Sequence, residues 1–118
     1  MANTFKLKSN ANMPASAGTP LTLYTCPSSP STTTVVLGLL LCNNDTSQRT
    51  VDVKIESDTN DTETNETVFL TKDTPIPATS SLELLAGNKI VLQATDVLKV
   101  DSDVAGKIDA TLSIMEIT

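Results

Sequence analysis

Residues 31–45 read STTTVVLGLLLCNND and form the most apolar stretch of the chain. The uninterrupted apolar part, residues 35–42, is far shorter than the ~20 residues that a helix needs to cross a bilayer. The threonines and valines at its start favour a strand, and Asn43, Asn44 and Asp45 at its end favour a turn. The stretch therefore predicts a buried β-strand and not a membrane span.

Both faces of this predicted strand are apolar, which is unusual for a strand with one wet face. Strict alternation divides its residues into two sets: Val35, Leu37, Leu39 and Leu41 on one face, and Val36, Gly38, Leu40 and Cys42 on the other. One face must meet the domain core. The other is covered by a second layer of the same chain or by a neighbouring subunit, and the sequence leaves both alternatives open.

The remaining segments predict an all-β chain, because none shows the 3.6-residue apolar period of an amphipathic helix. Strands are expected at residues 4–8, 21–26, 33–42, 50–56, 67–72, 81–85, 89–93, 97–101 and 107–118. We predict a single-domain antiparallel β-sandwich, jelly-roll-like, of eight or nine short strands. Residues 1–20 would form an N-terminal strand and arm, and residues 21–118 the sandwich domain.

Two segments do not follow simple alternation. Pro75 and Pro77 predict an irregular segment over 73–79, because proline cannot donate to a central ladder. In the last strand the apolar residues change phase after Ile114, which predicts a β-bulge there or a strand covered on both faces.

Composition excludes several function classes. The 118 residues suffice for one domain, their net charge is −6, and they include no histidine and no tryptophan. An acidic surface repels phosphate, so we expect no nucleic-acid partner. Without histidine the Ser/His/Asp and Cys/His catalytic arrangements are impossible, and no glycine-rich phosphate loop is present. We therefore expect no enzymatic activity, no cofactor and no membrane partner. The N-terminus has no apolar segment typical of a secretion signal, which predicts synthesis in a cytoplasm.

The two cysteines are expected to be free thiols. If residues 21–26 and 33–42 form a hairpin across the turn at 27–30, Cys26 and Cys42 lie at opposite ends of the second strand. At about 3.3 Å per residue their separation exceeds the ~7 Å limit between the Cα atoms of a disulfide several-fold.

The acidic loop Asp58 to Glu66 is the best candidate for a hard cation. It departs from the EF-hand pattern, because Glu63 holds the position of the turn glycine and Phe69 that of the final glutamate. We predict a solvated loop and no metal site, and cation binding stays open.

Two segments are candidates for an interface. Phe5 and Leu7 alternate with polar neighbours as in an edge strand, and the polar residues 9–19 would give them reach as an arm that adds to the sheet of a neighbour. Alternatively, residues 4–8 pair within their own sheet, and the contact lies at the corner formed by Pro75, Ile76 and Pro77. There the two prolines would either offer Ile76 to a neighbour or only stiffen a connection between strands.

Four segments together resemble small structural proteins of tailed-phage virions, particularly those of marine cyanophages. They are TPLTLYTCPSS (19–29), STTTVVLGLLLCNND (31–45), KDTPIPATSSLELLAGNKIVLQATDVLKVDS (72–102) and the final MEIT (115–118). The resemblance implies a β-sandwich or jelly-roll subunit, made in the cytoplasm of the host bacterium and present in many copies on the virion. It carries no active-site residues.

Within a virion, the leading expectation is a head decoration or cement protein that binds the major capsid protein. A neck or tail subunit is the near alternative. The resemblance also implies a homo-oligomer, with three copies expected. A carbohydrate-binding β-sandwich of a host-recognition fibre is an alternative of another class, but Tyr24 is the only polar aromatic residue available to stack on a sugar.

Overall fold

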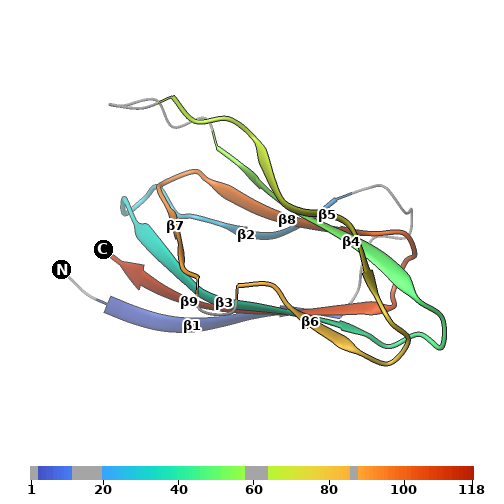
Figure 1. Cartoon of the computed structure of the whole chain (residues 1–118). Helices are drawn as coiled ribbons and strands as arrows, with labels where there is room; N and C mark the ends of the chain where they lie inside the picture. Colours follow the sequence, from blue (N-terminus) through green and yellow to red (C-terminus); the bar gives the residue numbers. More distant parts are fainter. Residues whose placement is uncertain (1–2, 12–19, 58–63, 86–87) are drawn as a thin grey trace.

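The strands pair into two antiparallel sheets that lie face to face, as Figure 1 shows. The computed structural model describes residues 3–11, 20–57, 64–85 and 88–118, and these residues contain no helix. The nine strands are β1 (Asn3–Asn10), β2 (Leu21–Thr25), β3 (Thr33–Asn43), β4 (Arg49–Glu56), β5 (Val68–Ile76), β6 (Ser81–Glu83), β7 (Ile90–Leu92), β8 (Val97–Ser102) and β9 (Ile108–Ile117). The predicted all-β sandwich is confirmed.

Sheet A has the strand order β1-β9-β3, with both β6 and β7 paired to the other edge of β3. Sheet B has the order β2-β8-β4-β5. The inner faces of both sheets form one apolar core, to which sheet A contributes Val36, Leu39, Leu41, Leu112 and Ile114, and sheet B contributes Val51, Val53, Leu98 and Val100. No helix found among the described residues is long and apolar enough to span a membrane.

The hairpin between the second and third strands, which the cysteine argument assumed, does not form. β2 pairs with β8 in sheet B, whereas β3 pairs with β9 in sheet A, so the connection between them crosses from one sheet to the other. The main chain of Cys26 is already bonded across the end of β2: its N–H donates to the carbonyl of Asp96 (2.8 Å), and its carbonyl accepts from Thr95 (2.9 Å). The apolar β3 instead takes the central place in sheet A.

A register shift in β3 changes the predicted division of its side chains. The ladder to β9 slips by one residue between Val36 and Gly38, which is a β-bulge. Val36 therefore points into the core together with Leu39 and Leu41, and not on the opposite face to them. Leu40 points outward and is 41% exposed.

The alternation of β9 continues unchanged to its end. Its buried residues include Ile108, Ala110, Leu112 and Ile114, as predicted, and the next core-facing position is Glu116. The phase change expected after Ile114 is absent, because the extra residue lies in the facing strand β3. Met115 and Ile117 point outward and are half-buried.

β5 is longer than predicted. It continues through Pro75, which lies opposite Thr50, and ends at Ile76. Because β5 is an edge strand of sheet B, Pro75 needs no second partner for its main chain. The ladder accommodates the segment through register shifts around Val53 and a positive φ at Asp73.

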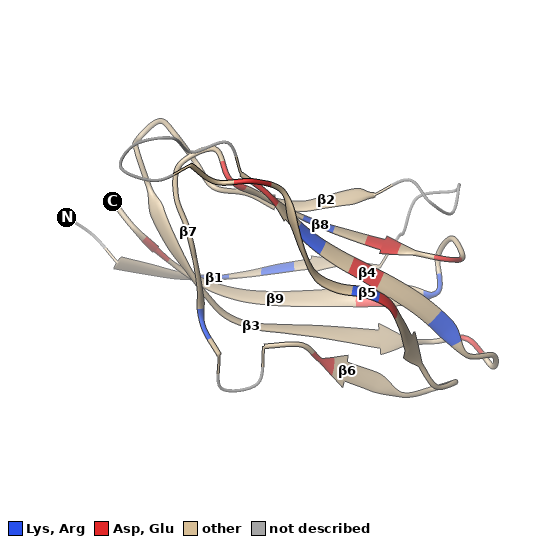
Figure 2. Ribbon diagram, turned by 45° about the horizontal axis from the view of Figure 1, so that its top comes forward, with Lys and Arg blue, Asp and Glu red and all other residues tan. Residues whose placement is uncertain are grey.

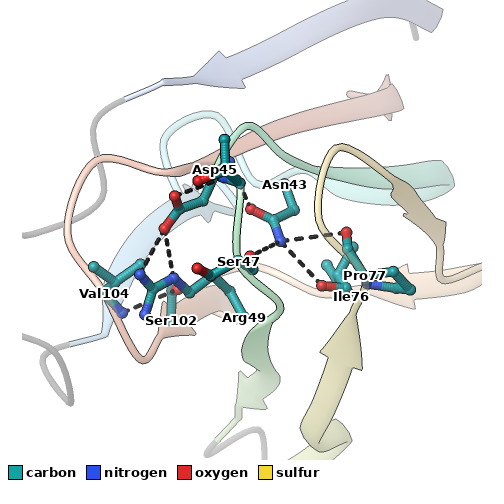
Figure 3. A network of polar contacts seen from close by, with 9 residues as sticks. Asn43, Asp45, Ser47, Arg49, Ile76, Pro77, Ser102 and Val104 are labelled. Carbon is teal, nitrogen blue, oxygen red and sulfur yellow. Dashed lines mark hydrogen bonds and ion pairs between the residues drawn. The ribbon is translucent and has the colours of Figure 1, made fainter.

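A polar network holds the turn that carries the chain from β3 in sheet A to β4 in sheet B (Figure 3). The side-chain amide of Asn43, which is fully buried, donates to the carbonyls of Ser47 (3.0 Å), Ile76 (3.0 Å) and Pro77 (3.3 Å). Its carbonyl oxygen accepts the N–H of Asp45 at 2.9 Å. The sequence marked Asn43 only as a turn former, whereas the structure makes it the link between the turn and the end of β5.

We expect Asn43→Ala to lower the free energy of unfolding by about 3 kcal/mol, because it leaves several main-chain groups at a buried site without their partner. Asn44→Ala is the matched control: Asn44 is exposed, and its side chain donates to Asp109 at the surface. Its loss should cost under about 1 kcal/mol. Urea unfolding of the two variants measures the difference, and equal effects would contradict a structural role of Asn43.

Candidate interface on the outer face of sheet A

An apolar row crosses the outer face of sheet A. Phe5 of β1 lies opposite Met115 of β9, Met115 lies opposite Val35 of β3, and Val35 lies opposite Val91 of β7. Directly paired residues point to the same face of a sheet, so these side chains adjoin. The two ends of the row are the most open, with Phe5 72% and Val91 59% exposed.

Further apolar side chains extend the row along the strands. Leu7 is 65% exposed beside Ser113, Leu40 is exposed beside Thr111, and Ile117 lies beside Thr33. The intervening outward positions are small or hydroxyl-bearing. The outward charges on these strands lie toward the other end of the sheet, at Glu83 of β6 and Asp109 of β9. The central part of this face therefore offers apolar contact and no charge.

The outer face of sheet B is different in kind. Its outward residues include Asp52, Lys54 and Glu56 of β4 and Lys99 and Asp101 of β8. Glu56 accepts ion pairs from Lys54 (3.2 Å) and Lys99 (3.0 Å). Hydrogen bonds from Lys99 and then Lys54 hold the pKa of Glu56 below its usual range.

Figure 2 shows this contrast: charged bands follow β4, β5 and β8, whereas β3 carries no charge along its length. Charged faces are well solvated, and interface cores are depleted of charge. An exposed, contiguous apolar surface marks an interaction site more often than it occurs by chance. The outer face of sheet A is thus the candidate interface.

β1 is fixed to the sandwich by its ladder to β9 and by one partly buried ion pair, and not by apolar burial. None of its described residues belongs to the core. Its ladder to β9 is reinforced by Lys6, whose ammonium group lies 2.8 Å from a carboxylate oxygen of Glu116. The ladder itself places Phe5, next to Lys6 in the strand, opposite Met115, and the ion pair adds to it.

Glu116 also connects the two sheets. Only 6% of the residue is exposed, and the hydroxyl of Tyr24 in β2 donates to its carboxylate at 2.6 Å. Because that proton is committed to Glu116, the hydroxyl of Thr34 in β3 donates to the Tyr24 oxygen at 2.8 Å. The hydrogen bond from Lys6 and then that from Tyr24 hold the pKa of Glu116 below its usual range. Burial, followed by the bond to Glu116, raises the pKa of Tyr24.

The predicted interface residues fall into two separate places. Phe5 and Leu7 lie on β1 at the edge of sheet A and point to its outer face, in the part that carries no charge. Of the two alternatives for the proline corner, the one that offers Ile76 to a neighbour is wrong, because its side chain is 1% exposed in the core and its carbonyl accepts from Asn43. Pro75 and Pro77 are exposed at the edge of sheet B. The role of each of these residues in an interface stays a prediction.

Cys26 and Cys42 are free thiols, as predicted. The Cys26 sulfur lies 3.3 Å from the Thr34 hydroxyl, at the start of β3, whereas Cys42 lies near the end of that strand. Their separation along β3 therefore keeps them apart even though the predicted hairpin is absent. Burial raises the pKa of the Cys26 thiol.

The acidic loop lies mostly outside the described residues, which resume at Thr64. Within the part of the chain that is described, no group of three or more cysteine or carboxylate side chains is arranged to hold a metal ion. Cation binding by the loop stays open.

We expect Lys6→Met to lower the free energy of unfolding by about 1 kcal/mol, because it leaves Glu116 buried without its cation. The loss is at the low end for a buried pair, since the Lys6 side chain is 46% exposed. Lys8→Met, which removes the next lysine of the same strand, is the control. A loss of the same size for both variants would mean that total charge matters and the ion pair does not.

The same pair predicts an acid-side loss of stability. The pKa of Glu116 is lower in the folded protein than its ordinary value near 4.5, so its stabilising contribution is fully present above that pH. The contribution is lost as the pH falls through the folded pKa. Glu116→Gln should therefore unfold with a weaker dependence on pH below about 4.5 than the unaltered protein. Urea midpoints measured from pH 7 to pH 3 test this, and parallel curves for the two proteins would contradict it.

Comparison with known proteins gives relatives of the fold only. No protein-family model matches the chain, and no curated protein has a similar sequence. A structure of the infectious bursal disease virus particle matches with a TM-score of 0.56 and 12% identity, over 97% of this chain and 30% of the viral chain. The VP2 subviral particle of the same virus matches with a TM-score of 0.52 and 12% identity, over 97% of this chain and 32% of the other.

A pilus subunit has the same architecture. A Bacillus endospore appendage, from a family described as disulfide-linked pili, matches with a TM-score of 0.54 and 14% identity, over 99% of this chain and 87% of that one. The chain thus spans about a third of the viral proteins and most of the appendage protein. At these identities the likeness shows a shared fold: a β-sandwich also found in proteins of viral particles and of a pilus.

Proposed function

We propose that the protein is a non-enzymatic structural subunit of a virion, and that it binds a neighbouring subunit through the outer face of sheet A. The observation that carries the proposal is the uncharged central part of this face, with Phe5, Leu7 and Val91 exposed, whereas the outer face of sheet B is charged. The occurrence of the same sandwich in viral particles supports an assembly role.

More specifically, we propose a head decoration or cement subunit of a tailed phage, of the marine cyanophage type, that binds the major capsid protein. This finer assignment is supported by the resemblance of residues 19–29, 31–45, 72–102 and 115–118 to small virion proteins. It implies synthesis in the cytoplasm of the host bacterium, location in the virion and a homo-oligomer, with three copies predicted from the resemblance. A subunit of the neck or tail is the near alternative.

The buried position of Tyr24 disfavours a carbohydrate-binding function. Its side chain is 4% exposed, and its hydroxyl is bound to Glu116 and Thr34. It cannot stack on a sugar without opening the core. The other two aromatic residues, Phe5 and Phe69, have no hydroxyl to orient a sugar ring.

The proposal predicts that the double variant Phe5→Ser/Leu7→Ser binds phage particles assembled without this protein at least tenfold more weakly. Two exposed apolar side chains of this size at an interface are together worth more than the ~1.4 kcal/mol that a tenfold change represents. Co-sedimentation of labelled protein with such particles measures the affinity.

A matched control is available on the other sheet. Val68 and Phe69 of β5 are 51% and 49% exposed, so Val68→Ser/Phe69→Ser removes two exposed apolar side chains from the edge of sheet B, one on each face. We expect this variant to bind as the unaltered protein does, and far-ultraviolet circular dichroism should show that both variants are folded. Equal binding by both variants would count against the outer face of sheet A as the contact.

A further inference from the structure

β1 is the long, regular edge strand of the sandwich. All eight of its residues pair with β9 without a register shift. The other described strands at sheet edges are interrupted or short. β5 has register shifts and Pro75, and β2 has five residues with a shift between Thr22 and Tyr24. β6 and β7 have three residues each. Bulges, prolines and short length are the usual means by which proteins prevent further pairing at a sheet edge.

Among the described residues, no strand pairs with the outer edge of β1 between Asn3 and Ser9. β9 lies on one side of the strand, and alternate N–H and C=O groups point away from β9 on the other side. Seven of its eight residues are exposed. The charged groups near it do not protect the edge fully, because Lys6 is paired with Glu116 and both Lys6 and Lys8 lie on the face opposite to Phe5 and Leu7.

We infer that β1 pairs antiparallel with β1 of a second copy, so that sheet A continues through the contact about a two-fold axis. The strand is self-complementary, because Phe5 of one copy can lie opposite Leu7 of the other, twice over in the same contact. The outer faces of the two copies of sheet A then join into one surface of double width. In this register Lys6 also lies opposite Lys6 of the second copy, and each ammonium group is paired with the Glu116 carboxylate of its own chain.

This contact adds to the proposed function by naming one partner, a second copy of the chain. It rests on the proposed function only in assuming that the dimer forms part of a particle. A two-fold contact differs from the three copies that the sequence resemblance implies. The test needs only the purified full chain, so its failure is distinct from a failure of particle binding.

The test uses prolines at two successive positions, Leu7→Pro and Lys8→Pro. Successive N–H groups of a strand point to opposite sides, so one variant removes a bond to β9 and the other removes a donor that faces the second copy. Sedimentation equilibrium should show a dimer for the unaltered protein. The variant that loses only the donor facing the second copy should keep the thermal unfolding midpoint of the unaltered protein. Its dimer should have a dissociation constant at least tenfold higher.

Amide hydrogen exchange gives a readout that does not depend on variants. At concentrations where the dimer forms, alternate amides of β1 should become protected, whereas those of β2 should not change. The inference would be overturned if the protein stays monomeric at all concentrations or forms a trimer. It would also be overturned if both proline variants keep the dimer, or if the β1 amides exchange equally fast in the monomer and the dimer.

Discussion

The central constraint on this fold is that β3 is apolar on both faces while the chain is long enough for only two layers. β3 runs between β9 and the short strands β6 and β7, and its core face is buried by sheet B. No third layer covers the opposite face within the described residues, so Val35 and Leu40 are only partly buried or exposed. The two sheets consequently differ: sheet B presents charges to water, and sheet A presents apolar and hydroxyl groups.

The position of β1 depends on electrostatics more than on packing. Burying Glu116 at the end of the core is unfavourable unless the carboxylate is paired, and Lys6 and Tyr24 supply that pairing. In return, the carboxylate joins β1 to both sheets at a place where β1 itself offers no core residue. The exposed Phe5 and Leu7 are therefore held on a strand that is ordered without them.

Local alternation predicted the fold class and most strand positions, because a two-residue period is visible wherever one face is buried. Val51, Val53 and Ile55 of β4 are an example, and all three are buried. The partner of each strand was not predictable in this way. The pairing of β2 with β8 is a contact between residues more than 70 positions apart, and no local pattern encodes it.

Two of the errors have the same cause, a residue whose environment overrides its usual behaviour. Pro75 indicated a break but lies in an edge strand, where one side of the backbone needs no partner, and this extends β5 and buries Ile76. Glu116 occupies a core-facing position of β9. Because an apolar residue is expected at such a position, the glutamate made the apolar pattern look as if it moved to the other face of the strand. The candidate interface was predictable for Phe5 and Leu7 from alternation. Val35, Val91 and Met115 join it only through strand register.

The register of β1 and β9 also determines how the molecule responds to mechanical force. Asn3 lies opposite Ile117, and Figure 1 shows the two marked ends of the chain on the same side of sheet A. Tension applied between these ends acts across the ladder and would unzip β1 from β9 one residue pair at a time, starting at Asn3. Tension between Asn10 and Ile117 would act along the two strands and load the whole ladder in shear, so the same eight-residue contact is weak in one direction and strong in the other.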